Sequence, residues 1–122
     1  MKKRMIFLLI IIFLITGCIE SNSVKTYYLA LHIENNSNQT YDVNISIENS
    51  NSLIIFNSNI TLLPDETRFW KEITSIEDNY TLNLFLDDGR NLTINDLNPN
   101  TYKRWPKISF NETDIWYSIT QK

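Results

Sequence analysis

Seven Asn-x-Ser/Thr tripeptides are the most frequent pattern of chemical interest in this chain. They begin at Asn35, Asn38, Asn44, Asn59, Asn79, Asn91 and Asn111. In an exported protein, the side-chain amide of such an asparagine can accept a glycan. The tripeptide also arises without modification where Asn and Ser or Thr share the wet face of a strand, because side chains i and i+2 point the same way. The tripeptides at Asn44, Asn59, Asn79 and Asn91 have this form, with an apolar or aromatic residue in the middle.

The only cysteine, Cys18, stands at the end of an export-type N-terminus. Lys2, Lys3 and Arg4 precede an apolar run over residues 5–15, and small residues then lead to the cysteine. A basic start, an apolar run and small residues in this order indicate a secretory signal peptide. The segment Ile15-Thr16-Gly17-Cys18 resembles the lipobox of prokaryotic lipoproteins. In that family the signal is cleaved before the cysteine, whose sulfur carries lipid.

The resemblance implies a signal peptide over residues 1–17, with Ile15, Thr16 and Gly17 as its cleavage motif, and a lipidated Cys18. It predicts a membrane-anchored protein that faces outside the cytoplasm, with membrane lipid as its first partner. An uncleaved anchor and a simple secreted protein are the alternatives, although a spanning helix needs about 20 apolar residues. Cys18 and residues 19–25 would form a short tether that reaches about 25 Å at most.

Composition narrows the range of functions. The 122 residues are enough for one small domain, and no second cysteine exists to form a disulfide. The formal charge is −3, and residues 1–17 carry three positive and no negative charges, which leaves −6 for the rest. An acidic domain is a poor partner for nucleic acid, so none is expected.

Metal and catalytic sites are not expected either. Zinc and copper sites use several His or Cys ligands, and His32 is the only histidine. The acidic pairs Asp65-Glu66 and Asp87-Asp88 match no calcium loop, so they are interpreted as solvated turns. No serine lies in a nucleophile-elbow motif. The sequence therefore predicts no cofactor, no metal and no enzymatic activity.

Three tryptophans form the remaining candidate site, because exposed Trp beside Arg or Lys is typical of binding hot spots. They are Trp70, Trp105 and Trp116. If Phe69 and Ile73 face the core, alternation directs Trp70 to the wet face of its strand. The alternative is that these rings belong to the core, as large aromatics commonly do.

The elements that would position these residues are strands. Apolar and polar residues alternate with a period of two from residue 26 onward, and no segment has helical periodicity. Strands are expected over residues 27–34, 41–48, 53–63, 67–74, 80–86, 92–94, 107–110 and 115–119. Asp87-Asp88-Gly89 predicts a tight hairpin, and residues 98–106 would form a loop that contains Trp105.

The order of these elements resembles the immunoglobulin-like domains of archaeal and bacterial surface proteins, notably small archaeal lipoproteins. In that family an L-x-P-x-x turn precedes a strand, and a Y-x-V-x-V-x-L-x-D-G strand follows. Leu63-Pro64-Asp65-Glu66 and residues 80–89 stand at the matching places. The resemblance implies an all-β fold over residues 26–122, a single antiparallel immunoglobulin-like β-sandwich of seven to nine short strands. It implies no catalytic residues.

Three functions are consistent with these observations. The first is a non-catalytic binding or scaffolding module of the cell envelope, with an envelope protein as its partner. The second is a carbohydrate-binding module that uses the three tryptophans to bind a glycan. The third, which is the weakest, is an inhibitor of extracytoplasmic proteases that presents residues 98–106 as its inhibitory loop.

Overall fold

The computed structural model describes residues 26–99 and 104–121. The expected signal peptide, Cys18 and the tether lie outside these residues. Every element of the described chain is a strand: β1 (Leu29–Asn35), β2 (Tyr41–Glu48), β3 (Ile54–Leu62), β4 (Thr67–Thr74), β5 (Tyr80–Leu86), β6 (Asn91–Leu97), β7 (Arg104–Phe110) and β8 (Ile115–Gln121). The all-β prediction is confirmed, and the eight described strands fall within the expected seven to nine.

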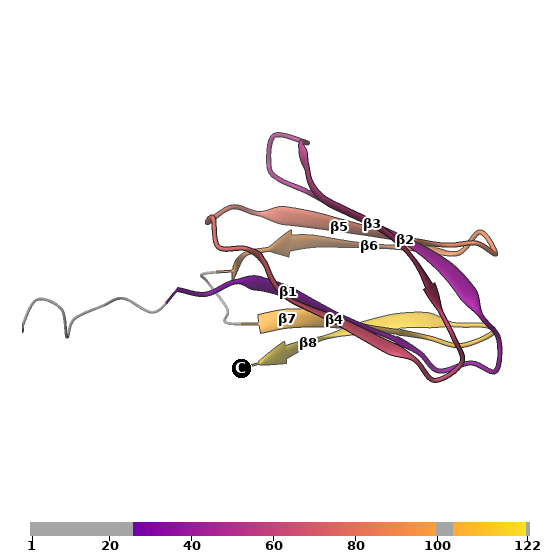
Figure 1. Ribbon diagram of the computed structural model, residues 1–122. Helices are drawn as coiled ribbons and strands as arrows, with labels where there is room; N and C mark the ends of the chain where they lie inside the picture. Colours follow the sequence, from indigo (N-terminus) through magenta and orange to yellow (C-terminus); the bar gives the residue numbers. More distant parts are fainter. Residues whose placement is uncertain (1–25, 100–103, 122) are drawn as a thin grey trace, which may run out of the picture.

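The strands form two four-stranded sheets, ordered β4-β1-β7-β8 and β3-β2-β5-β6. Figure 1 shows them as two layers that face each other, so the fold is a β-sandwich. The period-two pattern explains this arrangement, because alternate residues of each strand enter the space between the layers. In β2 the residues Tyr41, Val43, Ile45 and Ile47 are at most 5% exposed, while the residues between them face outward.

One pairing departs from the antiparallel expectation. β1 pairs with β4 in the antiparallel sense but with β7 in the parallel sense, with Ile33 opposite Ile108. Parallel neighbours need a long connection between them. Here the connection contains all the strands from β2 to β6. The alternation of residues within single strands therefore could not predict the parallel pairing.

The start of β7 is also earlier than expected. Trp105 and Pro106 belong to the strand, opposite Thr120 and Ile119 of β8, rather than to a loop over residues 98–106. The candidate inhibitory loop is therefore shorter than predicted, and residues 100–103 lie outside the described part of the chain.

The turns agree with their sequences. Gly89 has a φ of 95°, a value that favours glycine, and its N–H donates to the carbonyl of Leu86 in the β5–β6 hairpin. Asp65 has a φ of 61° in the turn after Pro64, which asparagine and aspartate tolerate better than other side chains.

Asn35 ties three segments together at one end of the sandwich. Its side chain is completely buried, and Nδ2 donates to the carbonyls of Gln39, Leu62 and Leu63 at 2.8, 3.1 and 3.1 Å. Its Oδ1 accepts from the backbone N–H and the hydroxyl of Ser37 at 3.0 and 2.6 Å. The amide therefore links the end of β1 to the loop before β2 and to the end of β3.

Candidate binding surfaces

The three tryptophans lie in three different environments. Trp70 lies opposite Leu31, a completely buried residue, and packs against the core with its ring edge-to-face on Phe56 at 5.7 Å. The prediction that Trp70 faces solvent is therefore wrong. The cause is an irregularity in the β1–β4 pairing between Trp70 and Thr74, which reverses the alternation inferred from Ile73.

Phe69 takes the outward position that was expected for Trp70. It lies opposite His32, is 40% exposed, and meets the imidazole ring edge-on with 5.7 Å between the ring centroids. The centroid of the Trp105 ring lies 5.8 Å from that of Phe69. We call these three residues, from β4, β1 and β7, the aromatic face. It lies on the outer surface of the β4-β1-β7-β8 sheet, and only Trp105 was predicted as part of a binding surface.

A shallow hollow of about 300 Å³ adjoins the aromatic face. It is lined by Tyr28, Ala30, Phe69, Lys71, Glu72 and Trp105. The charges around it nearly cancel, because Lys71 lies beside Glu72 in sequence and Lys107 pairs with Glu34 at 3.4 Å. The surface combines rings with a balanced charged rim, as protein interfaces commonly do.

Trp116 lies apart from this cluster. It is 44% exposed on the edge strand β8 and lies opposite Ser109, whereas Trp105 lies opposite Thr120. Measured along β7, the positions of the half-buried Trp105 and of Trp116 are four residues apart, about 13 Å. The structure therefore does not bring the three predicted tryptophans together in one site.

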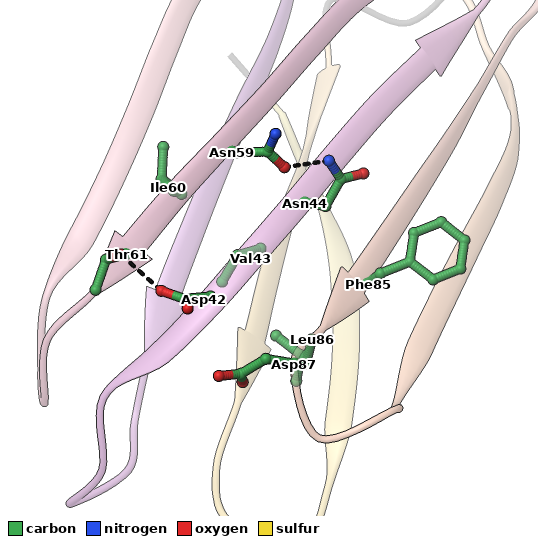
Figure 2. A pocket seen from close by; sticks show the side chains of 9 residues that line it. All are labelled: Asp42, Val43, Asn44, Asn59, Ile60, Thr61, Phe85, Leu86 and Asp87. Carbon is green, nitrogen blue, oxygen red and sulfur yellow. Dashed lines mark hydrogen bonds between the residues drawn. The ribbon is translucent and has the colours of Figure 1, made fainter.

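The outer surface of the other sheet is polar and contains a larger hollow, of about 470 Å³ (Figure 2). One row of facing residues crosses it, with Asn59 opposite Asn44 and Asn44 opposite Phe85. The side-chain amides of Asn44 and Asn59 are hydrogen-bonded to each other. In the next row the hydroxyl of Thr61 donates to Asp42 at 2.6 Å, and Asp87 lines the same hollow.

Phe85 is the one aromatic side chain among the residues that line this hollow, and it is 48% exposed. It was not predicted as a site residue. The alternation of Tyr80, Leu82, Leu84 and Leu86 was the signal for it, since a strand with these residues in the core must direct Phe85 outward.

The candidate glycan acceptors divide into three groups. Asn44, Asn59, Asn79 and Asn91 lie beside residues that are buried or packed against the core, namely Ile45, Ile60, Tyr80 and Leu92. The strand geometry that can generate these tripeptides without modification is therefore present at Asn44, Asn59 and Asn91, whereas Asn79 immediately precedes β5. Asn38 is exposed. Asn111 is half-buried, and its side-chain Oδ1 accepts hydrogen bonds from the backbone N–H groups of Thr113 and Asp114.

Asn35 differs from the other six. Its amide nitrogen makes three hydrogen bonds in a fully buried position, so the folded domain leaves no room for a glycan there. This candidate acceptor is corrected to a structural residue. The turn after Asn35 is also held by a hydrogen bond to a residue distant in sequence. The backbone N–H of Asn38 donates to Glu112 at 2.7 Å, which lowers the pKa of that carboxyl group.

Within residues 26–99 and 104–121, no group of three His, Cys, Asp or Glu side chains could hold a metal ion. His32 lies in mid-strand on the aromatic face, opposite Phe69 and Lys107. In the same described ranges, no helix is long and apolar enough to cross a membrane.

Comparison with known proteins gives no family for this chain. No family model matches it, and neither does any curated protein. Among solved structures, an NMR structure of a protein from Eubacterium rectale is similar, with 14% identity and a TM-score of 0.47. The match covers 77% of this chain and 89% of that protein.

Proposed function

We propose that this protein is a membrane-anchored, non-catalytic binding module of the cell envelope, and that the aromatic face binds an envelope protein. One observation carries the proposal. Phe69, His32 and Trp105 form a cluster of touching rings on an outer sheet surface, where polar residues are the norm. Clustered aromatic side chains with nearby cations are typical of protein-binding hot spots.

The anchor is part of the same proposal. The N-terminal sequence supports a lipid on Cys18, and residues 19–25 would keep the domain close to the membrane. A module held there would find its partners among membrane and envelope proteins.

The proposal includes an immunoglobulin-like fold. The order β3-β2-β5-β6 corresponds to the C′-C-F-G sheet of such domains, and β4-β1 corresponds to their E and B strands. The β7–β8 hairpin then occupies the side of β1 where the A strand lies in an immunoglobulin domain. The parallel β1–β7 pairing would make this a variant of that fold.

Replacement of Phe69 by Ser tests the aromatic face. If Phe69 is a hot spot that contributes about 2 kcal/mol, we expect affinity for the envelope partner to fall about 30-fold. The readout is co-isolation of crosslinked proteins from membranes that contain the full chain. Phe85→Ser is a matched control, because Phe85 is also an outward phenylalanine within a strand but belongs to the other sheet. Equal co-isolation with both variants would contradict the proposal.

Carbohydrate binding is the second candidate function. The hollow that Phe85 lines supports it better than the three tryptophans do. The partly exposed Phe85 lines this hollow together with two carboxylates and two amides, namely Asp42, Asp87, Asn44 and Asn59. An apolar surface surrounded by a few oriented polar groups suits a ligand with both C–H and hydroxyl faces. Trp70 is partly buried against the core and Trp116 is distant, so the three tryptophans support carbohydrate binding less well.

The same two variants separate this candidate from the first. A carbohydrate module predicts that Phe85→Ser reduces retention on a panel of neutral and envelope-type glycans by about tenfold. Phe69→Ser should then leave retention unchanged. No retention of the unsubstituted protein on any glycan, or equal retention of both variants, would eliminate this candidate.

A further inference from the structure

The edge strand β3 lacks the charged side chains and the proline that normally protect a sheet edge. Among the described strands it pairs only with β2, which leaves its other side open. Residues 53–63 contain no charged side chain, no proline and no glycine. Such an edge presents free N–H and C=O groups to any strand that can pair with it.

Two other edges of the sandwich are protected. β4 carries Arg68, Lys71 and Glu72, and its pairing with β1 is irregular. β6 carries Asp96 at a φ of 60° and also has an irregular pairing. Charges and bulges of this kind are the usual means by which proteins discourage edge pairing. The open edge of β3 is therefore not a general property of this domain.

The side chains of β3 are nearly symmetric about Ser58. In an antiparallel pairing of two copies centred there, Asn57 lies opposite Asn59 and Phe56 opposite Ile60. Each side-chain amide is thus opposite another amide, and each apolar side chain is opposite another apolar one. The edge strand β8 is also uncharged over residues 115–121, but pairing about Ser118 would place Trp116 opposite Thr120. Only β3 is complementary to itself in this way.

The ends of β3 carry apolar side chains that the folded monomer leaves in water. Leu53 just before its start and Ile54 at its start are 62% and 61% exposed, and Leu63 just after its end is 53% exposed. Antiparallel pairing would bring the start of one copy to the end of the other, so these groups would meet and leave water. An irregularity at Ile54 and Ile55 limits regular pairing about Ser58 to residues 56–60, so these end groups would meet outside the regular ladder.

From these observations we infer that a second copy of this chain docks on β3. The two strands pair antiparallel about a two-fold axis at Ser58 and join two four-stranded sheets into one of eight strands. The amides of Asn57 and Asn59 then extend the row that already links Asn44 to both of them within one copy. The interface uses one strand from each copy, so the dimer is weak in solution. This inference does not depend on the proposed function.

A cysteine at the symmetry axis tests the pairing. Facing residues of antiparallel strands have Cα atoms about 4.5–5.5 Å apart, which a disulfide can span. We expect the full-length Ser58→Cys protein in membranes to form a disulfide-linked dimer under mild oxidation. Ser118→Cys on β8 is the matched control, and the unsubstituted protein reports any crosslinking through Cys18. Absence of the Ser58→Cys dimer, or equal crosslinking of Ser118→Cys, would overturn the inference.

Charged substitutions at Asn57 and Asn59, on either side of Ser58, test the register of the β3–β3 pairing. Asn57→Lys with Asn59→Lys places like charges opposite each other twice, and should reduce the dimer fraction about tenfold. Asn57→Asp with Asn59→Lys places opposite charges together and should restore it. Sedimentation in detergent measures both variants without a new cysteine, and circular dichroism confirms that they are folded. If the two folded variants sediment alike, the register is wrong.

Discussion

Replacement of Asn35 by Asp is expected to destabilise the domain by about 3–5 kcal/mol. The change removes the amide NH2 group that the carbonyls of Gln39, Leu62 and Leu63 share as their hydrogen-bond donor. It also places a carboxylate against those carbonyl oxygens in a fully buried position. Domains of this size have a free energy of unfolding of only about 5–15 kcal/mol. The substitution would therefore remove a large part of the stability.

The pH dependence of this loss has a definite sign. Burial beside carbonyl oxygens would raise the pKa of the introduced carboxyl group above its unfolded value. The free energy of unfolding of Asn35→Asp, relative to the unsubstituted protein, should therefore fall as the pH rises through the acidic range. At low pH the protonated carboxyl group can donate one hydrogen bond. The difference in free energy of unfolding between the two proteins should therefore become smaller.

Urea unfolding over a range of pH measures this effect. The matched control is Asn36→Asp, since Asn36 is adjacent in sequence and exposed. The control should change the free energy of unfolding by less than about 0.5 kcal/mol. If Asn35→Asp were as stable as the control at neutral pH, the buried linking role of Asn35 would be refuted.

The second large effect concerns the anchor. The intact mass of the protein from its native membrane should lack residues 1–17 and include acyl groups on Cys18. More than one acyl chain is expected, because a single chain gives only weak and reversible membrane binding. Cys18→Ser removes the sulfur that carries the lipid, and the acyl mass should then be absent.

The same mass spectrum answers two further questions. Glycan increments would mean that some of the tripeptides are modified, and Asn35 should not be among the modified sites. An unprocessed and unmodified mass would mean that residues 5–15 form an uncleaved anchor, and the lipoprotein interpretation would fail.

Much of the fold could be predicted from the sequence because its strands bury one face each. The bounds expected for β4 and β5 agree with the structure, and the core positions of β2 follow the period of two. The same reasoning could have identified Phe85 as an outward residue. Local pattern was sufficient wherever the alternation ran without interruption.

The candidate site was harder to predict because it depends on pairings between distant strands. An irregularity in the β1–β4 pairing reversed the orientations of Phe69 and Trp70. No residue type in the sequence indicates this irregularity. The parallel contact of β1 with β7 brings Trp105 beside Phe69, although the two are 36 residues apart. Asn35 fits a glycosylation tripeptide, and only the tertiary structure gives its amide other partners.

Position-specific photocrosslinking in the native membrane tests the central claim most directly. A photoreactive side chain is placed at Phe69 in the full chain, and in a parallel sample at Phe85 on the other sheet. The proposed function predicts a discrete crosslinked envelope protein from position 69 and none from position 85. The same protein captured equally at both positions, or capture at position 85 alone, would show that the aromatic face is not the binding surface.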